Sequence, residues 1–298
     1  MFFTLFNVQI STENKDQLLD RVSKYLTLSQ SEKPLVIVTP NPEQIVYAQK
    51  DDKFRVLLNS ADISLPDGVG IVWAASLVQS DKFRVHRKKL LRTSNFEPQT
   101  KLERIPGIEF IEDLVKFAAE KDYPVGLIGG REGVALKSLN LLQEKYPGLT
   151  GWAEEPEINL KSQISNLKYT NEKNNNEYVS RMVQRIKETK TRLIFVGLGA
   201  PKQEYFMRKL SSKFKVQSSQ KKQPTSNYQL RTTNSLVLMS VGGAFDVISG
   251  KLPRAPEILR KIGLEWLWRL VREPWRIRRQ SALLKFFLLT LQQRFMVE

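Results

Sequence analysis

Short apolar runs alternate along the chain with longer stretches in which apolar residues recur at helical spacing. The runs predict strands at Leu35–Thr39, Ala61–Leu65, Pro124–Ile128, Leu193–Val196 and Leu236–Val241. The longer stretches predict helices at Pro42–Gln49, Val69–Val78, Ile108–Ala119, Val134–Lys145, Lys202–Leu210 and Ala244–Ile248. Such alternation is typical of a mostly parallel sheet with helices on both faces. The pattern therefore predicts an α/β fold built on a Rossmann-like sheet.

The loops after these strands are the expected place for a binding site, because ligands of such sheets bind beyond the carboxyl ends of the strands. Glycine in these loops lets the backbone approach a ligand and leaves N–H groups free for a diphosphate, which makes Gly129 and Gly130 candidate substrate-binding residues. Ordinary turns and helix caps explain such glycines equally well. The dinucleotide fingerprint G-x-G-x-x-G is absent, since Lys202 stands where a third glycine would follow Gly197 and Gly199.

Asp67 is the clearest candidate for a catalytic group. A carboxylate directly after a strand can act as a general base, although the same position suits an N-cap for the following helix. Asn41 is similarly placed to cap a helix, and Gln203 to lie in the first turn of one. His86 stands in a basic stretch without a carboxylate pattern, and we interpret it as exposed and incidental.

The composition excludes several classes of chemistry. The 298 residues are 41% hydrophobic and 26% charged, which is ordinary for a globular protein. Because there is no cysteine and only one histidine, disulfides, iron–sulfur clusters, thiol nucleophiles and multi-histidine metal sites are excluded. No apolar run approaches the ~20 residues of a membrane-spanning helix, and Met1–Ile10 lacks the basic start of a signal peptide. We therefore expect a soluble or peripheral protein.

The net charge of +16 is concentrated in three segments, which leaves the rest of the chain near neutral. The segment 81–104 contains a basic insertion at about 81–101. The segment 211–235 is poor in apolar residues and predicts a flexible loop at about 211–234. Another polar stretch, Lys168–Glu177, predicts a surface connection. A basic excess outside the main fold disfavours a nucleic-acid-binding groove. The segments are 81–104, 211–235 and 251–298, with net charges of +5, +5 and +7.

The C-terminal segment combines aromatic and basic side chains. From Gly263 onward the chain holds three of its five tryptophans, with arginines interleaved among them. Both a membrane interface and RNA attract this combination, but helical spacing and the apolar run Leu283–Leu291 favour lipid. The alternative is a helix packed on the core with a solvated basic side.

A set of motifs follows in order between Leu35 and Arg279. They are TPNPEQIVYA, ADISLPDGVGIVWA, ERIPG, VGLIGGREGVA, FVGLGAPKQE and VGGAFDVISGKLPRAP, the last running into GLEWLWRLVREPWR. As a set they resemble the WecG/TagA/CpsF family of bacterial glycosyltransferases. The resemblance implies an inverting enzyme that moves N-acetylmannosamine, or its uronic acid, from a UDP donor to a polyprenyl-diphosphate-linked acceptor sugar. It also implies synthesis of cell-surface polysaccharide or teichoic acid at the inner face of the cytoplasmic membrane, without a metal or other cofactor.

The resemblance also assigns roles to individual residues. It implies that Asp67 is the general base on the acceptor hydroxyl, and that Arg104 and Gln203 contact the donor sugar or its diphosphate. Arginines of the C-terminal segment would neutralise the departing UDP, which is coherent where no metal supplies the charge. The further substrate-binding residues implied are Thr39, Asn41, Arg269, Arg276 and Arg279.

The expected organisation is an α/β catalytic domain at 1–250 and a C-terminal appendage at 251–298 that binds membrane and closes the active site. The expected partners are the UDP-sugar, the lipid-linked acceptor and the membrane surface, but not nucleic acid, and homo-oligomerisation is left open. Two other classes compete. The isoelectric point near 9.9 suits a non-catalytic polyanion-binding or nucleic-acid-binding α/β protein, and a Rossmann-type oxidoreductase is disfavoured by the missing fingerprint.

Overall fold

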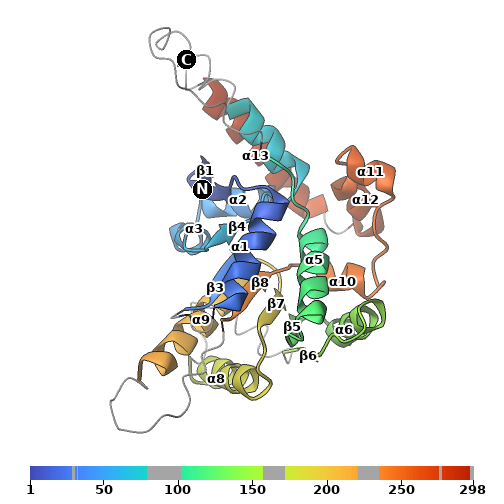
Figure 1. Cartoon of the computed structure of the whole chain (residues 1–298). Coiled ribbons are helices and arrows are strands. Elements are labelled where there is room, and N and C mark those ends of the chain that lie inside the picture. The colour runs from blue at the N-terminus through green and yellow to red at the C-terminus, as the bar shows by residue number, and fades with distance from the viewer. Residues whose placement is uncertain are drawn as a thin grey trace, which may run out of the picture.

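The computed structural model describes residues 1–28, 31, 33–78, 102–156, 172–220, 235–274 and 277–295. Within these residues a parallel sheet of six strands, in the order β4-β3-β8-β7-β5-β6, forms the centre of the molecule (Figure 1). The predicted α/β, Rossmann-like fold is therefore confirmed. The strands are β3 (Leu35–Val38), β4 (Ile63–Ser64), β5 (Val125–Gly129), β6 (Gly151–Glu154), β7 (Leu193–Gly197) and β8 (Val237–Ser240).

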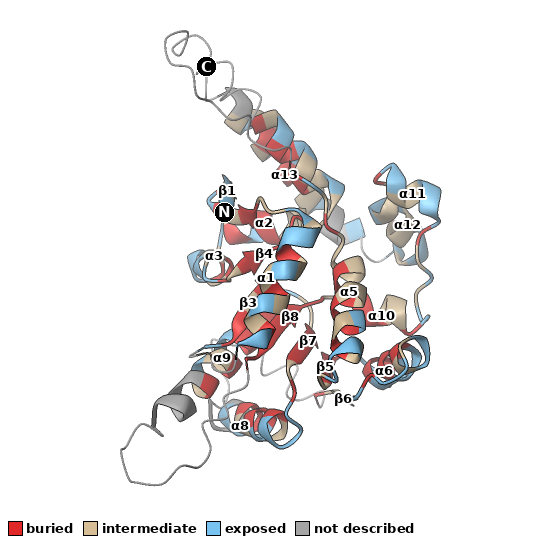
Figure 2. Cartoon of the chain, viewed as in Figure 1, coloured by how far each residue is buried: buried red, intermediate tan, exposed pale blue. Residues whose placement is uncertain are grey.

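Helices cover both faces of the sheet, because neighbouring residues of each strand point to opposite faces. In β7, for example, Phe195 packs into the hydrophobic cluster on one face and Val196 into the cluster on the other. The first face is covered by α1 (Lys15–Thr27), α5 (Gly107–Glu120), α6 (Val134–Lys145) and α10 (Ala244–Ile248). The second is covered by α2 (Pro42–Ala48), α3 (Asp52–Asn59), a helix at 69–78, α8 (Glu172–Glu188) and α9 (Lys202–Gln220). Figure 2 shows the buried strands between these layers.

The C-terminal helices divide into two groups. The helices α11 (Glu257–Lys261) and α12 (Glu265–Arg272) lie beyond α5 and α10, whereas α13 (Ile277–Phe295) runs along α2 (Figure 1). Phe286 of α13 is buried and meets Phe6 edge to face, with ring centroids 5.6 Å apart. Phe287 stacks on Trp73 of the helix at 69–78 at 5.4 Å. One face of α13 therefore packs on the core, as the alternative interpretation of this segment expected.

Two polar stretches expected to be loops are partly helical, so these predictions are wrong in part. The helix α9 continues past Leu210 to Gln220, because this stretch contains no proline or glycine and its Phe214 is buried in the core cluster. Lys213 also donates to the carbonyl oxygen of Asn176, at 2.6 Å, across the contact with α8. The helix α8 begins at Glu172, within the stretch predicted as a surface connection.

Several elements were not predicted from the sequence. They are the antiparallel hairpin of β1 (Phe2–Leu5) and β2 (Val8–Ser11), the helices α1, α3 and α8, and the edge strand β6. The basic insertion at about 81–101 and the remainder of the predicted loop, 221–234, lie outside the described residues. Among the helices that the structure describes, none combines the length and the apolar character needed to cross a bilayer.

Candidate functional site

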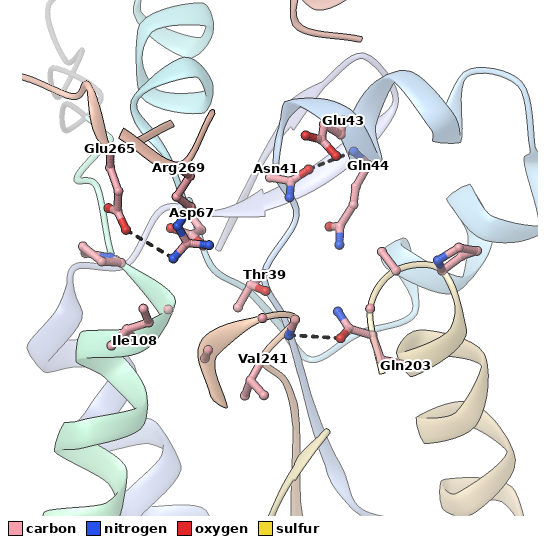
Figure 3. A pocket seen from close by; sticks show the side chains of 18 of the residues that line it. Thr39, Asn41, Glu43, Gln44, Asp67, Ile108, Gln203, Val241, Glu265 and Arg269 are labelled. Carbon is pink, nitrogen blue, oxygen red and sulfur yellow. Dashed lines mark hydrogen bonds and ion pairs between the residues drawn. The ribbon is translucent and has the colours of Figure 1, made fainter. Parts of the chain in front are cut away.

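A cavity of about 370 Å³ opens at the carboxyl edge of the sheet. It lies where β3 and β8, the first and last strands of the sheet in chain order, are neighbours, which is the crevice such sheets use for ligands. The loops after β3, β4, β7 and β8 contribute its walls, together with α5 and α12 (Figure 3). Thr39, Asn41, Asp67, Gln203 and Arg269, all predicted as site residues, line this one cavity.

Thr39 and Asn41 are held by the backbone around the crevice. The Thr39 hydroxyl donates to the carbonyl oxygen of Ser240 at 3.3 Å, which ties the ends of β3 and β8 together. Asn41 accepts a hydrogen bond from the Gln44 N–H at 2.9 Å and so caps α2. The two predicted positions of Asn41, at the cap of a helix and in the pocket, are therefore both confirmed.

Asp67 follows β4, and its carboxylate lies near the backbone of Gly107 at the start of α5, which favours the ionised form. Among the described residues no amide in the first turn of the helix at 69–78 donates to it, so the structure does not support the N-cap alternative. Burial raises the pKa of Asp67 to about 6, and the nearby Glu265 carboxylate adds to this, while Arg104 and Arg269 oppose it. A carboxylate with this pKa is ionised at neutral pH and still able to accept a proton.

Two arginines and one glutamate surround Asp67. Glu265 of α12 accepts from Arg104 at 3.2 Å and from Arg269, one helical turn further on, at 3.3 Å. Arg104 also donates to the carbonyl oxygen of Arg260, at 2.9 Å, and so ties α11 and α12 to the main fold. Figure 3 shows Glu265 and Arg269 beside Asp67 at one end of the cavity. Arg104 is not among the lining residues and reaches this cluster through Glu265.

Gln203 lies at the other end of the cavity, in the first turn of α9 as its alternative interpretation expected (Figure 3). Its side-chain oxygen accepts from the Gly242 N–H at 3.0 Å, and its side-chain nitrogen donates to Glu204 at 2.7 Å. The amide thereby joins the loops after β7 and β8.

Gly129 and Gly130 do not line the cavity. A Cβ at Gly129 would lie 2.4 Å from the carbonyl oxygen of Gly197, and one at Gly130 would lie 2.3 Å from the Val134 side chain. Close packing against the end of β7 therefore accounts for Gly129, and close packing against the start of α6 accounts for Gly130. A contact between either of them and substrate stays a prediction.

Two predicted arginines are not placed by the structure. Arg276 lies outside the described residues, and Arg279 belongs to α13 but its side chain is not described. Conversely, sequence reasoning missed several residues that line the cavity or support it, among them Gln44, Glu204, Arg254 and Glu265. Of these residues, only Glu265 could have been identified from the sequence. It precedes Arg269 by four residues in a helical pattern, a spacing that predicts an ion pair.

The arrangement combines a carboxylate that can take a proton with cations that can stabilise a negatively charged leaving group. The carboxylate is Asp67, Arg269 and Arg254 are the arginines that line the cavity, and the fixed amide of Gln203 faces Asp67 and Arg269 across it. This combination suits transfer of a group from a phosphorylated donor to a hydroxyl.

Comparison with known proteins agrees with this chemistry. The model of the glycosyl transferase WecG/TagA/CpsF family matches residues 3–298. Proteins of Staphylococcus aureus strains MW2 and NCTC 8325 are each 29% identical over 267 residues, which cover 90% of this chain and 83% of the relative. A protein of strain MRSA252 is 28% identical over the same span. All three are named N-acetylglucosaminyldiphosphoundecaprenol N-acetyl-beta-D-mannosaminyltransferase.

Proposed function

Since the chain belongs to the WecG/TagA/CpsF family and is a glycosyltransferase, we propose that it moves an N-acetylmannosamine-type sugar from UDP to a polyprenyl-diphosphate-linked acceptor sugar. The observation that carries the proposal is the placement of Asp67 and Arg269 in one cavity, at the carboxyl edge of the sheet. The names of the Staphylococcus aureus relatives support the choice of sugar and acceptor. The product is an intermediate of cell-surface polysaccharide or teichoic acid synthesis.

The proposed reaction is a single displacement with inversion. The acceptor hydroxyl gives its proton to the Asp67 carboxylate while its oxygen bonds to the anomeric carbon. The bond from that carbon to the diphosphate oxygen breaks, and UDP leaves with the electron pair. Negative charge then develops on the diphosphate, and Arg269, with Arg104 behind it, stabilises that charge in place of a metal ion. For these cations to reach the diphosphate, Glu265 has to give up its ion pairs with them.

The helices after residue 251 fit a membrane-bound acceptor. They carry large apolar side chains that are exposed, and the segment has a net charge of +7, a combination that binds anionic lipid. Because α12 also contributes Arg269 to the cavity, lipid contact and closure of the site would involve the same helices. We therefore place the protein at the inner face of the cytoplasmic membrane. The exposed side chains are Ile258, Ile262, Trp266, Leu267, Val271, Ile277, Leu284, Phe287 and Leu288.

A transfer assay tests the proposed reaction. The protein is given a panel of UDP-sugars and a synthetic polyprenyl-diphosphate-N-acetylglucosamine acceptor, with EDTA present throughout. We expect transfer from UDP-N-acetylmannosamine or its uronic acid, and a product of inverted anomeric configuration. Failure with every donor, together with salt-dependent binding to RNA, would favour the non-catalytic alternative. Activity abolished by EDTA and restored by a divalent cation would contradict metal independence.

A vesicle-binding experiment tests the proposed membrane contact. The double substitution Ile262→Asp and Val271→Asp introduces two acidic groups on exposed apolar positions of the C-terminal helices, where Ile262 is 59% and Val271 67% exposed. We expect it to weaken binding to vesicles of anionic phospholipid by ~10-fold or more, because both burial and charge attraction are lost. The matched control is the double substitution Val56→Asp on α3 and Leu136→Asp on α6, at side chains that are 64% and 55% exposed. Equal losses for control and variant would refute a specific membrane face.

A further inference from the structure

A buried polar cluster lies beneath the Gln203 end of the cavity. Gln44 of α2 and Gln203 and Glu204 of α9 are respectively 7%, 1% and 2% exposed. The Oε1 atom of Glu204 accepts from the side-chain nitrogen of Gln203 at 2.7 Å and from that of Gln44 at 3.5 Å. Figure 3 shows Gln44 and Gln203 on the same side of the cavity, with the Gln44 amide directed from α2 toward Gln203. One carboxyl oxygen therefore links two glutamines that line the cavity from separate elements.

Two buried atoms of this cluster have no hydrogen-bond partner among the described residues. They are Oε2 of Glu204 and Oε1 of Gln44. If Glu204 were ionised, both atoms would be acceptors without a donor, which is costly in a buried site. A proton on Oε2 of Glu204 turns that atom into a donor. The acceptor without a partner is Oε1 of Gln44, and the nitrogen of the same amide already donates to Oε1 of Glu204. A carboxylic acid and a primary amide pair in this way through two hydrogen bonds.

The charges around Glu204 do not favour its ionised form. Among the described residues no cation forms an ion pair with it, and burial raises its pKa to about 7, against the hydrogen bonds from Gln203 and its own backbone N–H. The titratable neighbours on α2 and before α3 are engaged with each other, since Tyr47 donates to Asp51 at 3.1 Å. Arg208, one turn along α9, donates to Ser60 at 3.3 Å. The other titratable groups on α2 and at the start of α9 are Glu43, Lys202 and Tyr205.

The Oε1 atom of Glu204 and the Gly242 N–H together determine how the Gln203 amide is turned. Its oxygen is engaged by the Gly242 N–H and its nitrogen by Glu204, so the two ends of the amide cannot exchange places. One N–H of the Gln203 nitrogen is then left to donate to an oxygen of a bound substrate. With the amide reversed, Gln203 would lose both hydrogen bonds.

We propose that Glu204 is a positioning residue for sugar transfer: as a neutral carboxylic acid it holds Gln44 and Gln203 so that Gln203 presents an N–H donor to an oxygen of the sugar nucleotide. This inference rests on the proposed function, and Glu204 itself touches no substrate.

Substitution of Glu204 tests the hydrogen-bond pattern. Glu204→Gln replaces the neutral acid by an amide that still accepts at Oε1 and donates toward Gln44, so we expect kcat/KM at about pH 6 to stay within ~3-fold of the wild type. Glu204→Ala removes both hydrogen bonds, and we expect a loss of about 10- to 100-fold. A Gln variant as inactive as the Ala variant would overturn the proposal.

The pH profile separates positioning from mere packing. Above about pH 7 the wild-type Glu204 ionises and its donor is lost, so transfer by the wild type falls as pH rises through this value. Transfer by Glu204→Gln should not fall, because an amide does not titrate there. The matched control is Glu188→Gln on the exposed surface of α8, where Glu188 accepts from Gln184, and it should keep the wild-type profile. An unchanged fall in the Glu204→Gln variant would contradict the proposal.

Thermal unfolding tests the protonation state even if no transfer is found. The pKa of Glu204 is raised in the folded protein, so folding favours the protonated form and the wild type loses stability as pH rises from the unfolded pKa to about 7. The Gln variant lacks this loss. We therefore expect Tm of Glu204→Gln minus Tm of the wild type to be larger at about pH 8 than at about pH 5. A difference that does not change with pH would overturn the proposal independently of the transfer reaction.

Discussion

Asp67→Asn is expected to lower kcat for sugar transfer by ~10²- to 10⁴-fold, the range for loss of a general base. The amide keeps the size of the carboxylate, but it cannot take the proton of the acceptor hydroxyl. Because Asp67 acts on the acceptor, we expect the KM for the sugar nucleotide to change little. The measurement is steady-state transfer with each substrate varied in turn.

The pH dependence of the wild type gives the same test a second readout. The base works in its ionised form, so the rate should rise as pH increases through about 6, where Asp67 loses its proton. Together with the fall expected from Glu204 near pH 7, this predicts a bell-shaped profile with a narrow optimum between the two values. The residual activity of Asp67→Asn should lack the rising limb.

A matched control separates the loss of the base from a general effect of removing a negative charge. Asp20→Asn removes a carboxylate from the exposed face of α1, where Asp20 pairs only with Lys24 among the described residues. We expect this variant to retain wild-type activity. If Asp67→Asn behaved like Asp20→Asn, Asp67 would have no part in the mechanism.

Arg269→Ala is expected to lower kcat/KM by ~10²- to 10³-fold. Arg269 lines the cavity beside Asp67, and its guanidinium is held by Glu265 one helical turn away. Removing a preorganised cation costs the transition state more than the ground state, because charge on the leaving diphosphate is greatest there. Lysine keeps the charge but not the fork that binds two phosphate oxygens, so Arg269→Lys should lie between alanine and the wild type. Inhibition of transfer by added UDP should weaken in the same order.

The same helix offers the control. Arg272 of α12 does not line the cavity, and its guanidinium lies over the ring of Trp268, 4.8 Å from the centroid. Arg272→Ala therefore removes one positive charge from α12 without removing one from the site. Equal losses for Arg269→Ala and Arg272→Ala would show that the charge of the appendage, rather than the cation at Asp67, supports transfer.

The order of strands and helices and the position of the site are largely encoded in local sequence. The β-branched runs that became β3, β7 and β8 need no tertiary information, because a strand buried on both faces is apolar throughout. Once these strands are parallel, the loops after them must meet at one edge of the sheet. That is why Thr39, Asp67 and Gln203 could be expected in one pocket. The short hairpin β1–β2 and the two-turn helix α3 carry too little periodicity to be predicted in this way.

Other features depend on which segments become neighbours, and local sequence does not contain that information. Gly129 looks like a ligand-binding glycine in sequence, but its backbone lies against Gly197 because β5 and β7 are adjacent strands. Likewise Glu265 meets Arg104, and Glu204 meets Gln44, across more than a hundred residues of chain.

The pKa values of the two carboxyl groups, Asp67 and Glu204, also depend on the tertiary structure. A pKa follows from burial and from the charges and hydrogen bonds around a group. For Asp67 the causes are burial, Arg104, Gly107 and two residues of α12. For Glu204 they are burial and the hydrogen bond from Gln203. The sequence by itself thus determined five of the six strands of the central sheet, the edge of the sheet that carries the site and the residue types found there. The tertiary structure alone decided which of these residues form ion pairs or hydrogen bonds with one another, because those interactions act through space rather than along the chain.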